Sequence, residues 1–224
     1  MLLTAILFSR YRAFLGHTRF EVAPLTVVIG KNGAGKSVLT RLPLLLASGL
    51  SSQAEGPLDL EAGEVTHGAR FEDLINQRSA LPFSLGAEIS VEGRRLKFIT
   101  TLQLVVERHS LGVAKFELYE DEHAVVKLEA RPEDIGNLAG KFVGEFGAPK
   151  EPQEVRVRLA GLFPTEIEGQ PEISARLKSA RDSFEKCISR PSYIGPFRSE
   201  QGSLNRIPRQ SVRRSDEEVD IDED

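Results

Sequence analysis

Two short apolar runs near the start of the chain predict β-strands. Residues 2–8 and 25–29 are rich in Leu, Ile, Val and Phe, and polar residues or proline bound each run. The second run is apolar without interruption, which is typical of a strand buried on both faces of a sheet. A mostly apolar stretch from Val38 to Ala47 then predicts a helix, which Pro43 should kink or end early.

The period of the pattern changes to two from Glu88 onward. Alternating apolar and polar residues, interrupted by polar turns at 92–93 and 120–122, predict an antiparallel meander over residues 88–130. One face of this meander should be solvated, because every second residue is polar. A further short strand is predicted at 155–159.

Helical spacing returns toward the end of the chain. Apolar residues recur every three or four positions from Ile173 to Ile188, behind Pro171 and before Pro191. Proline is common at the first turn of a helix and cannot continue one, so these two prolines should bound the helix. Beyond about Gln210 the chain is too polar to bury a core, and the sequence contains no internal repeat.

The composition is that of an ordinary soluble globular protein. Of the 224 residues, 40% are hydrophobic and 28% are charged. The single cysteine, Cys187, excludes an internal disulfide and fits a reducing compartment. The apolar start, residues 1–8, lacks the basic segment and cleavage site of a signal peptide, and the run 42–47 is too short to cross a bilayer. We therefore expect a cytoplasmic protein that does not enter the membrane.

The net charge of −4 is unevenly distributed. Residues 211–224 contain two arginines and seven acidic residues, a balance of −5, which leaves +1 on residues 1–210. The body of the protein is thus nearly neutral and the end is acidic. Overall charge gives no support for binding to DNA.

The motif that carries chemistry follows the second apolar run. The pattern G-x-x-x-x-G-K-[ST] is matched by Gly30, Lys31, Asn32, Gly33, Ala34, Gly35, Lys36 and Ser37. Glycines in such a loop let successive N–H groups turn toward phosphates, and the following helix adds the partial positive charge of its N-terminus. Lys36 should reach the β- and γ-phosphates, and the Ser37 hydroxyl should ligate Mg²⁺. We therefore predict that the chain binds ATP with Mg²⁺, in preference to a glycine-rich turn without a ligand.

The form of the loop, with Asn32 two residues after its first glycine, resembles the P-loop of ABC, SMC and RecF-like ATPases. Upstream, residues 11–14 read Tyr-Arg-Ala-Phe, which is similar to the aromatic-basic-x-aromatic turn after the first strand in this group. That likeness makes Arg12 a candidate for a contact near the nucleotide. A solvated turn arginine is the alternative.

A second element of resemblance lies near the other end. Residues 193–198 read Tyr-Ile-Gly-Pro-Phe-Arg, which looks like the Tyr-hydrophobic-Gly-Pro-x-Arg element of AAA-type ATPases related to the OLD family. Such proteins often belong to phage-defence systems and carry or recruit a nuclease. The resemblance therefore implies a nuclease effector as one possible partner, and it assigns no role to Arg198.

Two parts that this group of ATPases requires are absent from the sequence. One is the Walker B strand, four apolar residues followed by Asp-Glu, and the other is a signature loop of the Leu-Ser-Gly-Gly type. Residues 116–122 end in three acids, but their alternation predicts a hairpin turn, and residues 199–203 match the signature loop poorly. The resemblance thus implies the front part of an ATPase, from a truncated or split gene.

Other candidate residues carry weaker predictions. The four histidines have no metal-ligand spacing, and Cys187 has no evident base beside it, so a buried or half-buried thiol is expected. Gln77 and Gln103 are both possible counterparts of the glutamine that senses the γ-phosphate in this group. The arginines between 198 and 214 could touch DNA phosphates, although a solvated loop is the better interpretation.

Together these features predict an α/β P-loop NTPase domain, the ABC-type nucleotide-binding lobe, with an antiparallel β subdomain. We expect a partial ATPase domain over residues 1–210 and a disordered acidic tail over 211–224. Within the domain we expect a P-loop core at 1–50, the meander at 88–130, and a helix and strand at 171–198.

Several functions are compatible with these parts. The chain could hydrolyse ATP with a homodimer partner or a second chain that supplies the Walker B strand and signature loop. It could bind nucleotide only, or be a decayed fragment of a defence-system ATPase. A small P-loop kinase or other NTPase is the alternative from a different class, which Asn32 and the turn at 11–14 argue against.

Overall fold

A single antiparallel sheet organises the chain. The computed structural model describes residues 1–51, 54, 56–62, 65–147, 151–188 and 191–194. Residues Met1–Tyr193 form one compact unit, and a second unit begins at Ile194. In the first unit nine strands lie in the order β2-β1-β3-β4-β5-β6-β7-β8-β9, and each pairs antiparallel with its neighbours.

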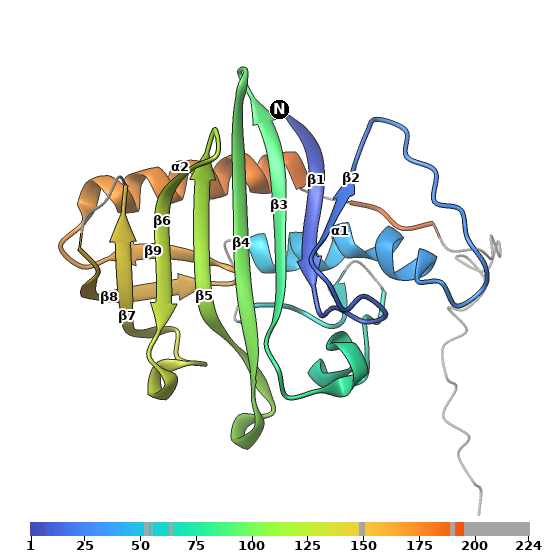
Figure 1. Ribbon diagram of the computed structural model, residues 1–224, viewed down its shortest axis with the longest axis horizontal. Helices are drawn as coiled ribbons and strands as arrows, with labels where there is room; N and C mark the ends of the chain where they lie inside the picture. The colour runs from blue at the N-terminus through green and yellow to red at the C-terminus, as the bar shows by residue number, and fades with distance from the viewer. Residues whose placement is uncertain (52–53, 55, 63–64, 148–150, 189–190, 195–224) are drawn as a thin grey trace, which may run out of the picture. The chain divides into compact units, whose positions relative to one another are not determined.

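The strands are β1 (Leu2–Ser9), β2 (Thr18–Glu21), β3 (Phe83–Val91), β4 (Arg94–Val105), β5 (Ser110–Glu120), β6 (His123–Ala130), β7 (Ala139–Phe146), β8 (Gln153–Ala160) and β9 (Phe163–Ile167). Two α-helices, α1 (Lys36–Leu50) and α2 (Pro171–Ile188), lie on one face of this sheet (Figure 1). Short 3-10 turns are η2 (Phe71–Leu74), η3 (Asn76–Arg78), η4 (Val106–Arg108) and η5 (Pro132–Asp134). None of the helices in the described ranges is long and apolar enough to cross a membrane.

The two predicted hairpin turns are present. Glu92 and Gly93 have φ values of 50° and 84° between β3 and β4, and Asp121 and Glu122 have φ values of 47° and 68° between β5 and β6. Two successive residues with positive φ match the right-handed twist of the flanking strands, so they connect hairpins well. The acidic run that ends at Glu122 is therefore a turn, as its alternation predicts, and no Walker B strand.

The core lies between the sheet and the two helices. Its centre is an aromatic cluster in which Phe184 of α2 lies 4.7 Å from Phe98 of β4 and Phe163 of β9 lies 4.8 Å from Phe116 of β5, measured between ring centroids. All four side chains are fully buried. The helix predicted after Pro171 is therefore confirmed. Its stripe of apolar side chains packs against the sheet and stabilises it.

Helix α1 runs through Pro43 without ending there, which corrects the expectation of an early end. It continues to Leu50 because Leu42, Leu45, Leu46 and Leu50 are all fully buried against the core. Burial of four leucines outweighs the roughly 3 kcal/mol that an interior proline costs a helix.

The sheet is larger and more continuous than the pattern predicts. β3 begins at Phe83 rather than near Glu88, and the meander continues past Ala130 through β7, β8 and β9. It is also continuous with β1, so the antiparallel part is no separate subdomain. The α/β content expected from the sequence is present, in a sheet whose strands are all antiparallel to their neighbours.

The prediction of a buried strand at 25–29 is wrong in this structure. These residues belong to no strand, and Leu25, Val27 and Ile29 are 83%, 72% and 89% exposed. Figure 1 shows the chain leaving the sheet after β2 and making a wide excursion before α1. The physical reason is that an apolar run records a preference for burial but does not supply the neighbouring strands that would bury it.

Candidate functional site

The P-loop lies between this excursion and the first turn of α1. Gly30 to Ala34 are exposed, and Gly35 is the N-cap of α1 in the left-handed conformation, with φ 91° and ψ 8°. No side chain caps the helix, and its first turn contains no acidic residue. Free N–H groups and the positive end of the helix dipole therefore face the loop, which is the arrangement that binds phosphates.

The side chain of Lys36 folds back over the loop. Its Nζ donates hydrogen bonds to the carbonyl oxygens of Gly30 at 2.7 Å and Lys31 at 2.8 Å. The ammonium group is thereby held inside the curve of the loop. In that place it can exchange these carbonyls for phosphate oxygens without leaving the site.

The turn at Tyr11–Phe14 forms the wall behind the P-loop. The N–H of Phe14 donates to the carbonyl of Tyr11 at 2.9 Å, and the Tyr11 ring is 1% exposed. A Cβ atom placed on Gly35 would lie only 3.0 Å from Cζ of Phe14. The aromatic turn and the start of α1 are thus in direct contact, so this turn positions the N-terminal end of the helix.

A third segment, Leu74–Arg78, is fastened to the same turn. The Arg12 N–H donates to the Leu74 carbonyl at 2.9 Å, and the Asn76 N–H donates to the Arg10 carbonyl at 2.7 Å. The Asn76 side-chain amide donates to the Arg12 carbonyl at 2.6 Å. These bonds attach the segment carrying Gln77 to the wall of the P-loop, a connection between distant stretches that the sequence pattern does not indicate.

The two candidate glutamines lie in different surroundings. Gln77 is exposed and has φ 55° and ψ 22°, so it projects from a left-handed position directly after the anchored Asn76. Gln103 lies within β4, where it pairs with Gly112 of β5. Left-handed non-glycine residues are uncommon and concentrate at functional loops, which distinguishes Gln77 from an ordinary strand residue.

Basic side chains gather beside α1. Burial lowers the pKa of His67, and the positive charges of Arg12 and Arg41 lower it further. Arg41 follows Ser37 by one helical turn, and its Nε is buried without a hydrogen-bond partner among the described residues. Its guanidinium carbon lies 5.1 Å from the ring centroid of Tyr193. Sequence analysis singled out Arg12 but missed Arg41, although its spacing of four from Ser37 puts both on one face of the helix.

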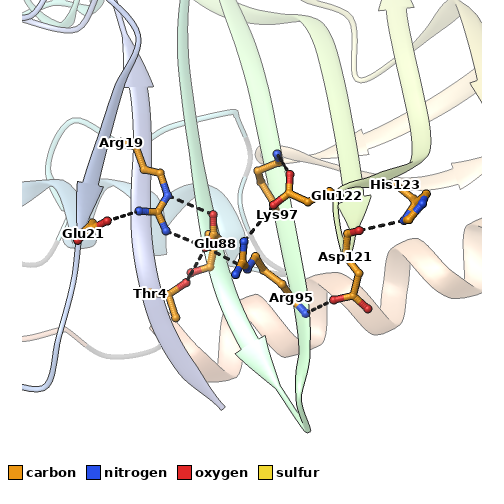
Figure 2. Close-up of polar contacts among 9 residues, drawn as sticks. All are labelled: Thr4, Arg19, Glu21, Glu88, Arg95, Lys97, Asp121, Glu122 and His123. Carbon is orange, nitrogen blue, oxygen red and sulfur yellow. Dashed lines mark hydrogen bonds and ion pairs between the residues drawn. The ribbon is translucent and has the colours of Figure 1, made fainter.

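A second polar cluster, shown in Figure 2, holds β2 to the sheet just before the P-loop excursion begins. The buried carboxylate of Glu88 on β3 accepts from Arg19 of β2 at 2.9 Å and from the Thr4 hydroxyl at 3.2 Å, and it lies 3.6 Å from Arg95. Burial alone would raise the pKa of Glu88, but Arg19, Thr4 and Arg95 together bring it below the ordinary value. Because the Glu88 carboxylate is already paired with Arg19 and Arg95, we interpret this cluster as holding β2 against β1 and β3 rather than as a ligand site.

The remaining candidates contribute no further chemistry. The thiol of Cys187 is half-buried, as predicted, and burial raises its pKa, which disfavours the reactive thiolate. Across the described ranges no three His, Cys, Asp or Glu side chains come together in a way that could hold a metal ion. Residues 195–198, the stretch 199–214 and the acidic tail 211–224 lie outside the described residues.

Comparison with known proteins yields little similarity. Neither a protein-family model nor a curated protein sequence matches the chain. One solved structure that matches is an SMC ATPase, described for ATP-driven dimerization and DNA-stimulated activation. It aligns at a TM-score of 0.36 and 14% identity, over 55% of this chain and 72% of that one.

Proposed function

We propose that this chain is the ATP-binding P-loop module of an ABC/SMC/RecF-like ATPase. The observation that carries the proposal is the geometry around Lys36: its ammonium lies within the loop, at the uncapped and acid-free N-terminus of α1. An ATP phosphate group satisfies both features, since it accepts from free N–H groups and from the lysine. Gly30 to Ser37 form the phosphate site in this proposal, and the Ser37 hydroxyl is a ligand of Mg²⁺.

Hydrolysis, in this proposal, requires groups from a second polypeptide. Mg²⁺ bound to phosphates usually takes one or two carboxylate ligands, and an attacking water needs a residue to orient it. Residues 22–41, which contain the P-loop, include no aspartate or glutamate. A second ATPase half or a homodimer partner would supply the Walker B acids and the signature loop. A nuclease effector and DNA are further partners that only the resemblance to defence ATPases suggests.

Two residues are proposed to face the nucleotide in addition to the P-loop. Arg12 belongs to the turn that packs on Gly35 through Phe14, and this neighbourhood supports a contact between its guanidinium and the phosphates. Gln77 is the better candidate for contact with the γ-phosphate, because hydrogen bonds fasten its segment to that same turn. Gln103 has no such connection to the loop.

A binding-only module is the second candidate function. The exposure of Leu25, Val27 and Ile29 favours it, because the apolar run that precedes the P-loop lies outside the sheet. A loop supported on one side only can still bind nucleotide, but it holds the phosphates less precisely than hydrolysis requires. Measured ATP turnover by the chain alone, abolished by Lys36→Ala, would exclude this second candidate.

The proposal is tested by titrating the full 224-residue chain with Mg-ATP in a calorimeter. We expect saturable binding that Lys36→Ala weakens at least about a hundredfold, since a charged hydrogen bond contributes about 1.5–3 kcal/mol and its loss leaves a phosphate unpaired. Lys115→Ala is the matched control, because this lysine lies on the solvated face of β5 with its side chain 52% exposed.

Two results would contradict the proposal. One is the absence of Mg-ATP binding by a chain whose circular dichroism shows it to be folded. The other is equal binding by the wild type and Lys36→Ala, because the affinity would then come from somewhere other than the P-loop.

A further inference from the structure

We propose that a hollow between α2 and the ends of strands β3 to β6 binds a small apolar monocarboxylate. Below, this hollow is called the α2 pocket, and it lies between Leu96, Leu118 and Val125 of the sheet and Ser179, Ala180 and Ser183 of the helix. No residue of the P-loop lines it, so the proposal does not depend on ATP binding.

Short side chains on α2 leave the space of the α2 pocket open. Leu177 and Phe184 of this helix are fully buried and fill the core on either side. Between them in the sequence, Ser179, Ala180 and Ser183 present short side chains on one face of the helix. The pocket encloses about 310 Å³. At about 30 Å³ each, the share of one water molecule in the liquid, this volume holds roughly ten non-hydrogen atoms.

The floor of the α2 pocket is apolar. Leu118, Val125 and Ala180 are only 2%, 6% and 5% exposed, and Leu96 packs against the same core. A hydrocarbon group in the pocket would therefore lie on a surface that is continuous with the protein interior. Removing its apolar surface from water favours binding, so the ligand should carry an apolar body.

Two arginines at the rim of the α2 pocket share one carboxylate. Glu120 lies on the face of β5 that also bears Leu118, since side chains two residues apart point the same way. It accepts hydrogen bonds from Arg94 of β4 at 3.0 Å and from Arg176 of α2 at 2.9 Å. Neither arginine makes another ion pair or side-chain hydrogen bond among the described residues. Each guanidinium therefore keeps unused donors.

This arrangement leaves one positive charge without a partner, which a bound carboxylate would neutralise. Arginine binds carboxylates through paired N–H donors, so the free side of each guanidinium suits such a group. The Glu88 cluster differs in this respect. There Arg19 and Arg95 each pair with a second acid, Glu21 and Glu122 respectively, and no positive charge is left over.

Glu92 restricts the charge of the ligand. It lines the α2 pocket and makes no ion pair among the described residues. Its negative charge therefore opposes a second anionic charge on a bound molecule. A monocarboxylate is favoured over a dicarboxylate or a phosphate monoester, which completes the description of the ligand class.

Binding is tested by titrating the full chain with octanoate and 3-phenylpropanoate in a calorimeter, without nucleotide. We expect saturable binding of both probes with a Kd below about 1 mM, as for ligands of this size in a formed pocket. The uncharged 3-phenylpropanamide should bind at least about tenfold more weakly, because it cannot make charged hydrogen bonds to the arginines. Acetate, which lacks the apolar body, should show no saturable binding below about 10 mM.

Variants of the charged rim test the recognition of the carboxylate. Glu120→Gln releases both arginines from their carboxylate, so the affinity for 3-phenylpropanoate should rise at least about fivefold. A role of Glu120 in stability alone would not raise it. The double variant Arg94→Met/Arg176→Met should abolish the preference for the acid over the amide. Lys115→Met/Arg158→Met is the matched control, because these side chains are 52% and 70% exposed and do not line the pocket.

A variant of the helix tests the location. Ser179→Leu places a large side chain in the α2 pocket and should weaken both probes at least about tenfold. Ala175→Leu is the matched control, since it adds a leucine at an exposed position of α2 that does not line the pocket. Leucine is a good helix former, so both variants should fold, which circular dichroism checks.

Three results would overturn the proposal. The first is no saturable binding of either probe by a chain that circular dichroism shows to be folded. The second is equal affinity for 3-phenylpropanoate and its amide, and the third is unchanged affinity in Glu120→Gln. Failure of the chain to bind Mg-ATP would contradict the proposed function and leave the α2 pocket unaffected.

Discussion

At the scale of single residues, the contact between Gly35 and Phe14 joins the N-terminus of α1 to the turn that follows β1. Gly35 has φ 91°, a conformation that costs other residues about 1–2 kcal/mol. Any side chain there would also meet the Phe14 ring, whose Cζ would lie 3.0 Å from the new Cβ. The glycine of the motif is thus required for the close approach of the aromatic wall as well as for its backbone conformation.

The variant Gly35→Ala should therefore lose both stability and Mg-ATP affinity. We expect the free energy of unfolding in urea to fall by about 2–3 kcal/mol, of which the positive φ accounts for about 1–2. Gly169→Ala is the matched control, because Gly169 has φ 75° but nothing lies within 4 Å of its added Cβ. Equal losses in the two variants would show that the Phe14 contact contributes nothing.

At the scale of elements, α1 is held firmly at its C-terminal end. Arg181 of α2 is only 7% exposed, and it donates to the carbonyls of Leu50 at 3.2 Å and Ser51 at 2.6 Å. No basic residue lies in the last turn of α1 itself, so α2 supplies the positive charge that complements its dipole. The backbone of Gly49 also accepts from the Leu162 N–H at 2.7 Å. Hydrogen bonds therefore fix the end of the helix that is far from the P-loop, and the packing of Phe14 against Gly35 fixes the end near it.

The substitution Arg181→Met should destabilise the protein strongly. It keeps most of the buried volume but removes two hydrogen bonds to buried carbonyls, which costs about 2–4 kcal/mol. Arg176→Met, on the same helix, is the control, because Arg176 is 52% exposed and pairs with Glu120 at the surface. Denaturant unfolding monitored by circular dichroism measures both, and a loss below about 1 kcal/mol in Arg181→Met would contradict the role as a cap.

At the scale of the whole molecule, the nine-stranded sheet brings residues from Leu2 to Ile167 together around one core. Its first edge is β2, which the Glu88 cluster holds in place before the chain departs for the P-loop (Figure 2). Because Glu88 is buried and paired with Arg19, its charge contributes to the stability of the entire sheet. This makes the free energy of unfolding depend on pH.

The direction of that dependence follows from the pKa of Glu88, which is lower in the folded protein than its ordinary value of 4.5. The stabilisation is complete above pH 4.5 and is lost as the pH falls through the folded pKa, since the unfolded chain then binds more protons. Glu88→Gln should cost about 1–3 kcal/mol at pH 7, and its difference from wild type should shrink below pH 4.5. Urea unfolding across this range measures the effect.

Glu129→Gln controls for the loss of one negative charge, because that side chain is 62% exposed on the solvated face. A constant difference between wild type and Glu88→Gln from pH 7 to below the folded pKa would contradict the assignment. It would show that the Glu88 carboxylate acts through its shape rather than its charge.

Local patterns in the sequence were sufficient for several parts of this structure. The turn at Glu92-Gly93 and the helix behind Pro171 follow from short-range rules, since turn chemistry and the apolar stripe of a helix involve residues close in sequence. The P-loop motif also follows from spacing alone, and its binding of phosphate stays a prediction. By contrast, Arg181 and Glu88 gave no local signal, because their partners lie on other elements.

The sequence by itself determined the elements that local periodicity specifies, and the eight-residue motif that we propose to bind phosphate. Only the tertiary structure decided which of these elements meet: that Phe14 packs on Gly35, that the segment of Gln77 is fastened to the Arg12 turn, and that residues 25–29 lie outside the sheet. The reason is that periodicity records which side chains favour burial, whereas burial itself depends on the elements that cover them. For residues 25–29 those elements are not among the described residues of this chain.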